Sequence, residues 1–153
     1  VPAQIWMGKF YLYGDATLRN PQLAYTWFLA AAQKQAPEAF YHLGMMLNQE
    51  KVDDHSPAQT RQFFEQAASL KYVPAYFQAG KHFFAAQPDM ETNQLPAKHL
   101  AKAYLWISAA IQRSEDMEEI LAAQSIRQQI IAIMPKTWLA ELDRKIAQHL
   151  QQN

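Results

Sequence analysis

The sequence predicts an all-α protein, a right-handed α-solenoid made of antiparallel helix pairs, with about eight helices in total. Three observations lead to this fold class. Gly8, Gly44 and Gly80 follow one another at a constant step of 36 residues, Ala-Ala pairs follow large aromatic residues, and prolines stand where helices would begin. A period in the thirties is typical of helical-hairpin repeats, in which each unit buries its apolar face only against its neighbours.

Other landmarks keep the same step and define the repeat units. Ala3, Ala39 and Ala75 are also 36 residues apart, and the tripeptide Val-Pro-Ala at 1–3 recurs at 73–75, two periods later. We therefore interpret the chain as a single array over 1–153, with repeat units at about 1–36, 37–73 and 74–113 and a C-terminal capping helix pair at 114–153.

Prolines mark the expected helix starts, because proline is tolerated in the first turn and breaks a helix elsewhere. Asn20-Pro21 and Ser56-Pro57 each combine an N-cap with a first helical residue, and Gln59 completes a capping box with Ser56. The same first-turn role is expected for Pro37, Pro74, Pro96 and Pro135, and Ser114 is expected to cap the seventh helix. The predicted helices are 3–14, 21–35, 37–48, 57–71, 74–86, 96–113, 115–133 and 136–151.

The apolar pattern inside these segments is helical. Ala24, Trp27, Phe28 and Ala31 recur at spacings of three and four residues, and no segment shows the sustained alternation of a strand. Small residues carry the packing prediction, since glycine and alanine at fixed repeat positions let two helices approach closely. The pairs concerned are Ala31-Ala32, Ala67-Ala68 and Ala109-Ala110.

Composition excludes several classes of protein. The chain is half hydrophobic and carries 14 basic and 14 acidic residues, so it can build a core and lacks the basic excess of a nucleic-acid-binding protein. The absence of cysteine excludes disulfides and thiolate metal sites. No apolar run reaches the roughly 20 residues of a membrane span. No signal peptide begins at Val1, and because Val1 stands in repeat register we expect a longer protein with any targeting segment upstream.

The repeated landmarks resemble Sel-1-like repeats, which are relatives of the tetratricopeptide repeat. The segment from Trp27 to Ala32 leads through Ala36-Pro37-Glu38-Ala39 to Leu43-Gly44, and a second copy runs from Phe63-Phe64 through Ala67-Ala68 to Ala79-Gly80. The tail at 117–149 resembles the paired closing helices of bacterial proteins with these repeats.

Two positions depart from the family pattern: 49–54 replaces the usual glycine-rich turn, and Ala79 stands where leucine is common. The resemblance implies a protein-binding scaffold within a larger bacterial protein, often exported or periplasmic, and it does not identify the partner.

Catalytic and metal-binding patterns are weak. Glu38 and His42 lie one helical turn apart, a spacing that could hold a metal, but no third ligand converges on them and we expect a surface pair. Asp53, Asp54 and His55 could bind a cation, although a solvated polar loop is the default interpretation. Glu118 and Glu119 would point about 100° apart on a helix and cannot act as a paired acid and base.

No phosphate-binding loop, nucleophile elbow or zinc-protease motif occurs in the sequence, so we expect neither enzymatic activity nor a cofactor. Four tryptophans, Trp6, Trp27, Trp106 and Trp138, could suggest sugar stacking, but three of them lie on apolar helical stripes and are expected in the core.

A groove on the concave face is the predicted binding site. In helical-hairpin arrays the first helix of each pair lines this face, and the residues one after and three before each repeat glycine should point into the groove. Exposed aromatic residues with Met and Lys suit an apolar peptide of some acidic character, unless these bulky side chains pack against neighbouring helices instead. The predicted groove residues are Ile5, Lys9, Tyr41, Met45, Asn48, Phe77, Lys81 and Phe84, and Leu12 extends the same line.

Two functions therefore remain open. The first is a non-catalytic protein–protein interaction scaffold for a partner peptide or protein. The second is a glycan- or cell-wall-associated module, or a repeat domain attached to a cell-wall enzyme. Exposed tryptophans or carboxylates in the groove would favour the second function, and a hydrophobic groove with few acids would favour the first.

The two ends of the array should differ. The last helix should turn Leu139, Leu142, Ile146 and Leu150 inward and Glu141, Arg144, Lys145 and Gln148 outward. The N-terminal face should expose apolar surface around Ile5, Trp6 and Phe10, from which we expect self-association through that end.

Overall fold

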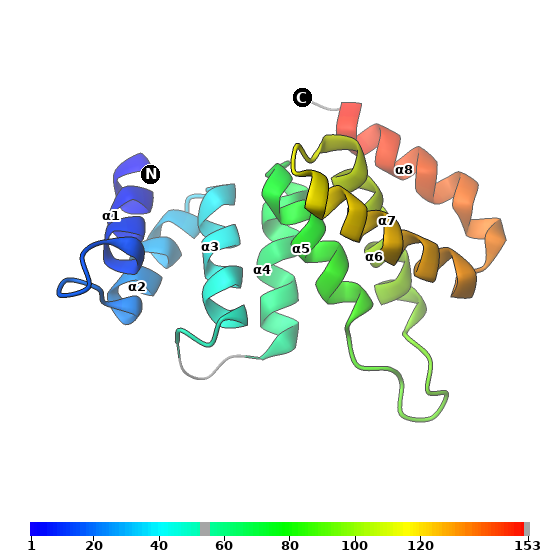
Figure 1. Ribbon diagram of the computed structural model, residues 1–153, viewed down its shortest axis with the longest axis horizontal. Coiled ribbons are helices and arrows are strands. Elements are labelled where there is room, and N and C mark those ends of the chain that lie inside the picture. Colours follow the sequence, from blue (N-terminus) through cyan, green and yellow to red (C-terminus); the bar gives the residue numbers. More distant parts are fainter. Residues whose placement is uncertain (53–55, 152–153) are drawn as a thin grey trace. The chain divides into compact units, whose positions relative to one another are not determined.

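The computed structural model describes residues 1–52 and 56–151, and within these ranges the protein is helical with no strand (Figure 1). The all-α prediction is confirmed for this part of the chain. The helices are α1 (Pro2–Tyr13), α2 (Pro21–Ala32), α3 (Pro37–Asn48), α4 (Pro57–Ser69), α5 (Val73–Phe84), α6 (Ala97–Arg113), α7 (Met117–Ile133) and α8 (Leu139–Gln151), with a 3₁₀ turn, η1 (Lys136–Trp138), before α8.

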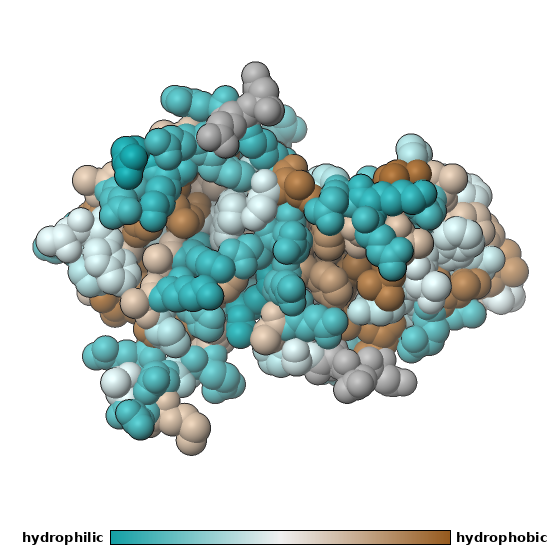
Figure 2. Space-filling model, turned by 180° about the vertical axis from the view of Figure 1, so that it is seen from behind, coloured by the Kyte–Doolittle hydropathy of each residue, from teal (hydrophilic) through white to brown (hydrophobic). Residues whose placement is uncertain are grey.

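The chain divides into two compact units, unit 1 (Val1–Tyr72) and unit 2 (Val73–Asn153). In unit 1 each helix packs against the next, from α1 to α4. In unit 2, α5 packs against α6, and α6 contacts both α7 and α8. Figure 2 shows hydrophilic residues interspersed with smaller hydrophobic patches on one face, as expected where helices turn a polar side to water.

Several helices begin where the capping residues predict. The side chain of Asn20 accepts a hydrogen bond from the amide of Leu23 at 3.1 Å, and Ser56 Oγ accepts one from Gln59 at 3.1 Å. Each cap satisfies an N–H group that the first helical turn leaves without a partner. Local chemistry therefore sets the starts of α2 and α4.

Three expected helix starts were wrong by a small margin. Asp116, and not Ser114, caps α7, because its carboxylate accepts from the amides of both Glu118 (3.0 Å) and Glu119 (3.3 Å). A carboxylate at this position also interacts favourably with the helix dipole. Pro96 and Pro135 occupy the N-cap positions of α6 and η1, and neither lies within the first turn.

The ends of α2 and α4 lie two to three residues earlier than expected. Gln35 (φ 58°) and Lys71 (φ 66°), again 36 residues apart, adopt the left-handed conformation just after these helices. The next residue in each case donates a hydrogen bond to the end of the helix. The amide of Ala36 donates to the carbonyl of Ala31 at 3.3 Å, and the amide of Tyr72 donates to the carbonyl of Ala67 at 3.0 Å. This is the Schellman arrangement, and the carbonyls that it satisfies belong to the Ala-Ala pairs.

Replacing Gln35 with Gly is expected to raise the free energy of unfolding by about 0.5–1 kcal/mol. A left-handed residue with a Cβ costs about 1–2 kcal/mol, and the greater chain entropy of glycine offsets part of the gain. Urea titration would measure the change. Gln33→Gly is the matched control, since Gln33 is also exposed but adopts the right-handed conformation (φ −58°), and this variant should lose stability. A loss of stability in Gln35→Gly would contradict the prediction.

The repeat glycines mark close contacts between paired helices. A Cβ atom built on Gly8 would lie 2.6 Å from the ring of Phe28, and one on Gly44 would lie 2.8 Å from the ring of Phe64. At Gly80 the corresponding atom would meet Ile107, at 2.5 Å from Cγ1 and 2.7 Å from the backbone nitrogen. The absence of a side chain thus allows α1, α3 and α5 to approach α2, α4 and α6 closely.

The core of each unit follows the predicted apolar pattern. The three Ala-Ala pairs are buried, as are Phe28, Leu43 and Phe64 in unit 1 and Tyr76, Tyr104 and Ile107 in unit 2. In α8, Leu142 and Ile146 are buried, Leu139 and Leu150 are half-buried, and Glu141, Arg144, Lys145 and Gln148 are exposed. The predicted inward and outward faces of α8 therefore agree with its burial pattern.

Candidate functional site

The predicted groove residues lie on α1 and α3 in unit 1 and on α5 in unit 2. Asn48 and Lys81 are exposed, and the other six are half-buried: Ile5, Lys9, Tyr41, Met45, Phe77 and Phe84. Leu12, expected to extend the line, is buried instead. It stands one helical turn after Gly8 and therefore shares the side of α1 that meets α2.

In unit 1 two of the groove residues, Lys9 and Tyr41, belong to a larger group that we call the α1–α3 cluster: Lys9, Glu38, Tyr41, His42 and, from the turn after α4, Tyr72. The Lys9 ammonium forms an ion pair with the Glu38 carboxylate and so joins α1 to α3. The same carboxylate oxygen lies 3.7 Å from His42 Nε2. Lys9 and Glu38 therefore neutralise each other's charge on this face.

His42 is buried, with 8% of its surface exposed, which corrects the expectation of a surface pair with Glu38. Its ring stacks on that of Phe28, with centroids 4.7 Å apart. This stacking draws the imidazole into the core of unit 1 and leaves its Nδ1 without a hydrogen-bond partner. Burial lowers the pKa of His42, and the nearby Glu38 charge partly opposes this effect.

Tyr41 is held by aromatic neighbours on both sides. Its ring centroid lies 5.3 Å from that of Tyr72 and 6.0 Å from that of Phe64. Burial raises the pKa of Tyr72, and the negative charge of Glu38 raises it further. Tyr41 thus presents a half-buried ring packed between two others, and a side chain that is ordered before a partner binds loses less entropy on binding.

The free energy of unfolding should fall as the pH drops from 7.5 to 5.5, partly because of His42. Its pKa is lowered in the folded state, so stability that is present above the unfolded pKa of about 6.5 is lost as the pH falls toward the folded pKa. His42→Phe would keep the stacking on Phe28 and remove the titrating group. Urea titrations at both pH values should show a weaker pH dependence in this variant, and an unchanged dependence would contradict the assignment.

In unit 2 the groove residues share one side of α5. Phe77 and Lys81 are one helical turn apart, and Lys81 Nζ lies 6.0 Å from the Phe77 ring centre, within reach of a cation–π interaction. Lys81 is exposed in the last turn of α5. This side of α5 combines a half-buried ring with an accessible positive charge.

The remaining candidate sites are the possible metal-binding residues and the neighbouring carboxylates Glu118 and Glu119. Within residues 1–52 and 56–151 no group of three His, Asp or Glu side chains could hold a metal ion, and Asp53, Asp54 and His55 lie outside the described residues. Glu118 is exposed, whereas Glu119 is half-buried and burial raises its pKa. No described helix is apolar over a length that would cross a membrane.

The tryptophans are not equivalent. Trp106 is buried, and Trp27 and Trp138 are half-buried, while Trp6 is 62% exposed and stacks on Phe10 with centroids 5.5 Å apart. Trp6 also lines a shallow hollow with Ile5, Lys9 and Glu38. The N-terminal apolar surface is therefore present, and self-association through it stays a prediction.

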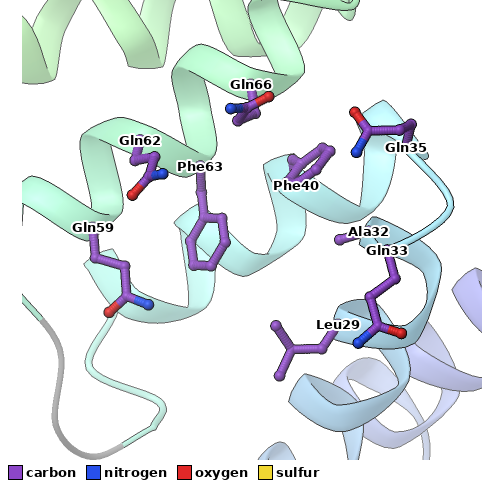
Figure 3. A pocket seen from close by; sticks show the side chains of 9 residues that line it. All are labelled: Leu29, Ala32, Gln33, Gln35, Phe40, Gln59, Gln62, Phe63 and Gln66. Carbon is purple, nitrogen blue, oxygen red and sulfur yellow. The ribbon is translucent and has the colours of Figure 1, made fainter.

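Sequence reasoning missed a pocket of about 500 Å³ in unit 1, which we call the glutamine pocket (Figure 3). Three helices, α2, α3 and α4, and the turn after α2 contribute to it. In the part of the chain that the structure describes, the lining has no ionisable side chain and consists of Leu29, Ala32, Gln33, Gln35, Phe40, Gln59, Gln62, Phe63 and Gln66. The available signal was the spacing of Gln59, Gln62 and Gln66, which places three amides on one face of a helix.

Comparison of the chain with protein-family models gives no match, and comparison with curated proteins gives no relative.

Proposed function

We propose that this chain is a non-catalytic protein–protein interaction scaffold, whose helix pairs stack as a right-handed α-solenoid of Sel-1-like repeats. The observation that carries the proposal is the contact of each repeat glycine with a large side chain of the paired helix, at Gly8, Gly44 and Gly80. A close helix contact at glycine that repeats every 36 residues is typical of repeat arrays, which commonly present extended binding surfaces.

In each unit, the residues flanking the repeat glycines supply a proposed binding surface. Tyr41 and Met45 offer half-buried apolar surface in unit 1, and Phe77 and Lys81 combine a ring with an exposed ammonium in unit 2. Rigid aromatic side chains commonly dominate protein interfaces. Because the charge of Lys9 is already balanced by Glu38, Lys81 is the residue that would select an acidic group in the partner.

The exposed Trp6 favours the alternative, a glycan-binding module. Its indole ring lies beside Lys9 and Glu38 at the edge of unit 1, an arrangement able to stack on a sugar and bond its hydroxyl groups. The two proposals share Lys9, but Trp6 belongs to the glycan site alone and Tyr41 and Phe77 to the scaffold alone, so variants at these three residues separate them.

Affinity purification from the native host, followed by mass spectrometry, would identify the partner, and calorimetry would measure its affinity for variants of the chain. Tyr41→Ala or Phe77→Ala is expected to weaken binding by about 2 kcal/mol, roughly 30-fold. Lys81→Gln should reduce the salt dependence of binding. Gln128→Ala, on an exposed position of α7, serves as the control with an unchanged affinity.

Circular dichroism would verify that each variant is folded. Unaltered affinity in folded Tyr41→Ala and Phe77→Ala would exclude the proposed surface. The glycan-binding alternative would be established if the unmodified chain bound neutral oligosaccharides and Trp6→Ala lost this binding, while Tyr41→Ala and Phe77→Ala kept it.

A further inference from the structure

The glutamine pocket lies in unit 1 and contains none of the proposed groove residues. Its wall on α4 is formed by Gln59, Gln62 and Gln66, and the opposite side carries Gln33 and Gln35, which follow α2 (Figure 3). Four of the five glutamines are exposed, and Gln59 is half-buried. Amides from two separate segments thus converge on one hollow of about 500 Å³, within the usual range of ligand pockets.

The residues that line the pocket favour an uncharged ligand. Within residues 1–52 and 56–151, no acidic, basic or histidine side chain contributes to the lining of this pocket, although charged residues make up 18% of the chain. A charged ligand group would lose hydration here without gaining a partner of opposite charge. Each glutamine amide instead offers two donors and an acceptor oxygen, which suits neutral carbonyl and amide groups.

The spacing of the amides fits an extended chain. Residues 59, 62 and 66 span about seven residues of α4, roughly 10 Å at 1.5 Å per residue. About three residues of an extended peptide cover the same distance at roughly 3.3 Å each. The three amides on α4 can therefore form hydrogen bonds with successive backbone groups of a bound peptide.

Between the two sets of amides lie apolar side chains. Phe63 projects from α4 into the pocket, and the ring centroid of Phe40 on α3 lies 6.4 Å from it at a tilt of 34° (Figure 3). Leu29 of α2 adds an exposed apolar group on the far side. Aromatic-lined grooves of this kind accept proline rings, whose helical backbone is already ordered and presents carbonyl acceptors.

We propose that the glutamine pocket binds an uncharged, proline-containing peptide segment in extended conformation. The glutamine amides bond the backbone carbonyls, and Phe63 and Leu29 contact the proline rings. This site is separate from the groove of the proposed function and would stand if the groove residues proved unimportant.

The test is titration of the full chain, followed by nitrogen-15 NMR and calorimetry, with three neutral probes of similar size. The probes are a capped Pro-Pro-Leu-Pro-Pro peptide, a capped Gly-Ser peptide of the same length, and a chitin tetrasaccharide. The proline peptide should shift the side-chain amide signals of Gln59, Gln62 and Gln66 and bind equally well at low and high salt.

The double variant Gln62→Ala/Gln66→Ala should weaken this binding about tenfold or more, because two hydrogen bonds to the ligand are lost. Both positions are exposed, so the fold should be retained, and Gln124→Ala/Gln128→Ala on α7 is the matched control with unchanged affinity. Binding of the tetrasaccharide in place of the proline peptide would overturn the proposal. So would equal binding of the Gly-Ser peptide, absence of binding by all three probes, or binding that salt abolishes.

Discussion

Replacing Phe64 with Ala is expected to lower the free energy of unfolding by about 3–5 kcal/mol, among the largest losses in this chain. The Phe64 side chain is fully buried, faces Gly44 across the contact between α3 and α4, and touches the ring of Tyr41. Its removal would lose the transfer free energy of the ring and leave a cavity that the backbone of Gly44 cannot fill.

The neighbouring Phe63→Ala is the matched control for this prediction. Phe63 is half-buried and lines the open glutamine pocket, so its truncation should cost much less. Urea titration monitored by circular dichroism would compare the two variants, with Phe64→Leu as a milder change if Phe64→Ala does not fold. Equal losses for Phe63→Ala and Phe64→Ala would contradict the assigned packing of Phe64 against Gly44.

Helix starts and the small-residue contacts could be predicted from the sequence because both depend on short-range rules. A capping side chain and a proline act within a single turn, as at Asn20-Pro21 and Ser56-Pro57. The glycine contacts are nonlocal, but their 36-residue step reveals them, since a similar close contact recurs in three helix pairs.

Helix ends could not be predicted as well, because left-handed residues after α2 and α4 are not glycines. The usual rule expects glycine or asparagine at this position, whereas the chain has Gln35 and Lys71. Their 36-residue spacing was the only available sign. In these turns the hydrogen bonds to the Ala-Ala carbonyls outweigh the local strain.

Properties that depend on several segments were the least predictable. The burial of His42 arises from stacking on Phe28 of another helix, and the pairing of Lys9 with Glu38 likewise joins two helices. The glutamine pocket combines side chains from α2, α3, α4 and the turn after α2. Residue spacing along one helix carries no information on which second helix faces it.

Replacing Gly80 with Ala is expected to lower the free energy of unfolding of unit 2 by about 1–3 kcal/mol. Within a helix, alanine normally stabilises a protein by roughly 1 kcal/mol relative to glycine, so the expected effect has the opposite sign. The new Cβ would lie 2.7 Å from the backbone nitrogen of Ile107, in addition to its Cγ1 at 2.5 Å. A backbone atom of α6 can move only if the helix moves, so the clash cannot be relieved by a side-chain rotation alone.

Gly8→Ala provides the comparison, because the nearest atoms there all belong to the Phe28 ring. That ring can shift, and the loss should be smaller than for Gly80→Ala. Adding Ile107→Val to Gly80→Ala removes the Cδ1 contact at 2.9 Å but keeps a γ-carbon and the backbone nitrogen, so it should restore only part of the stability. Full restoration would show that the Cδ1 contact, and not the contact with the backbone nitrogen, causes the loss of stability. If α5 instead shifts to accommodate the methyl group, Phe77 and Lys81 shift with it, and partner binding should weaken together with stability.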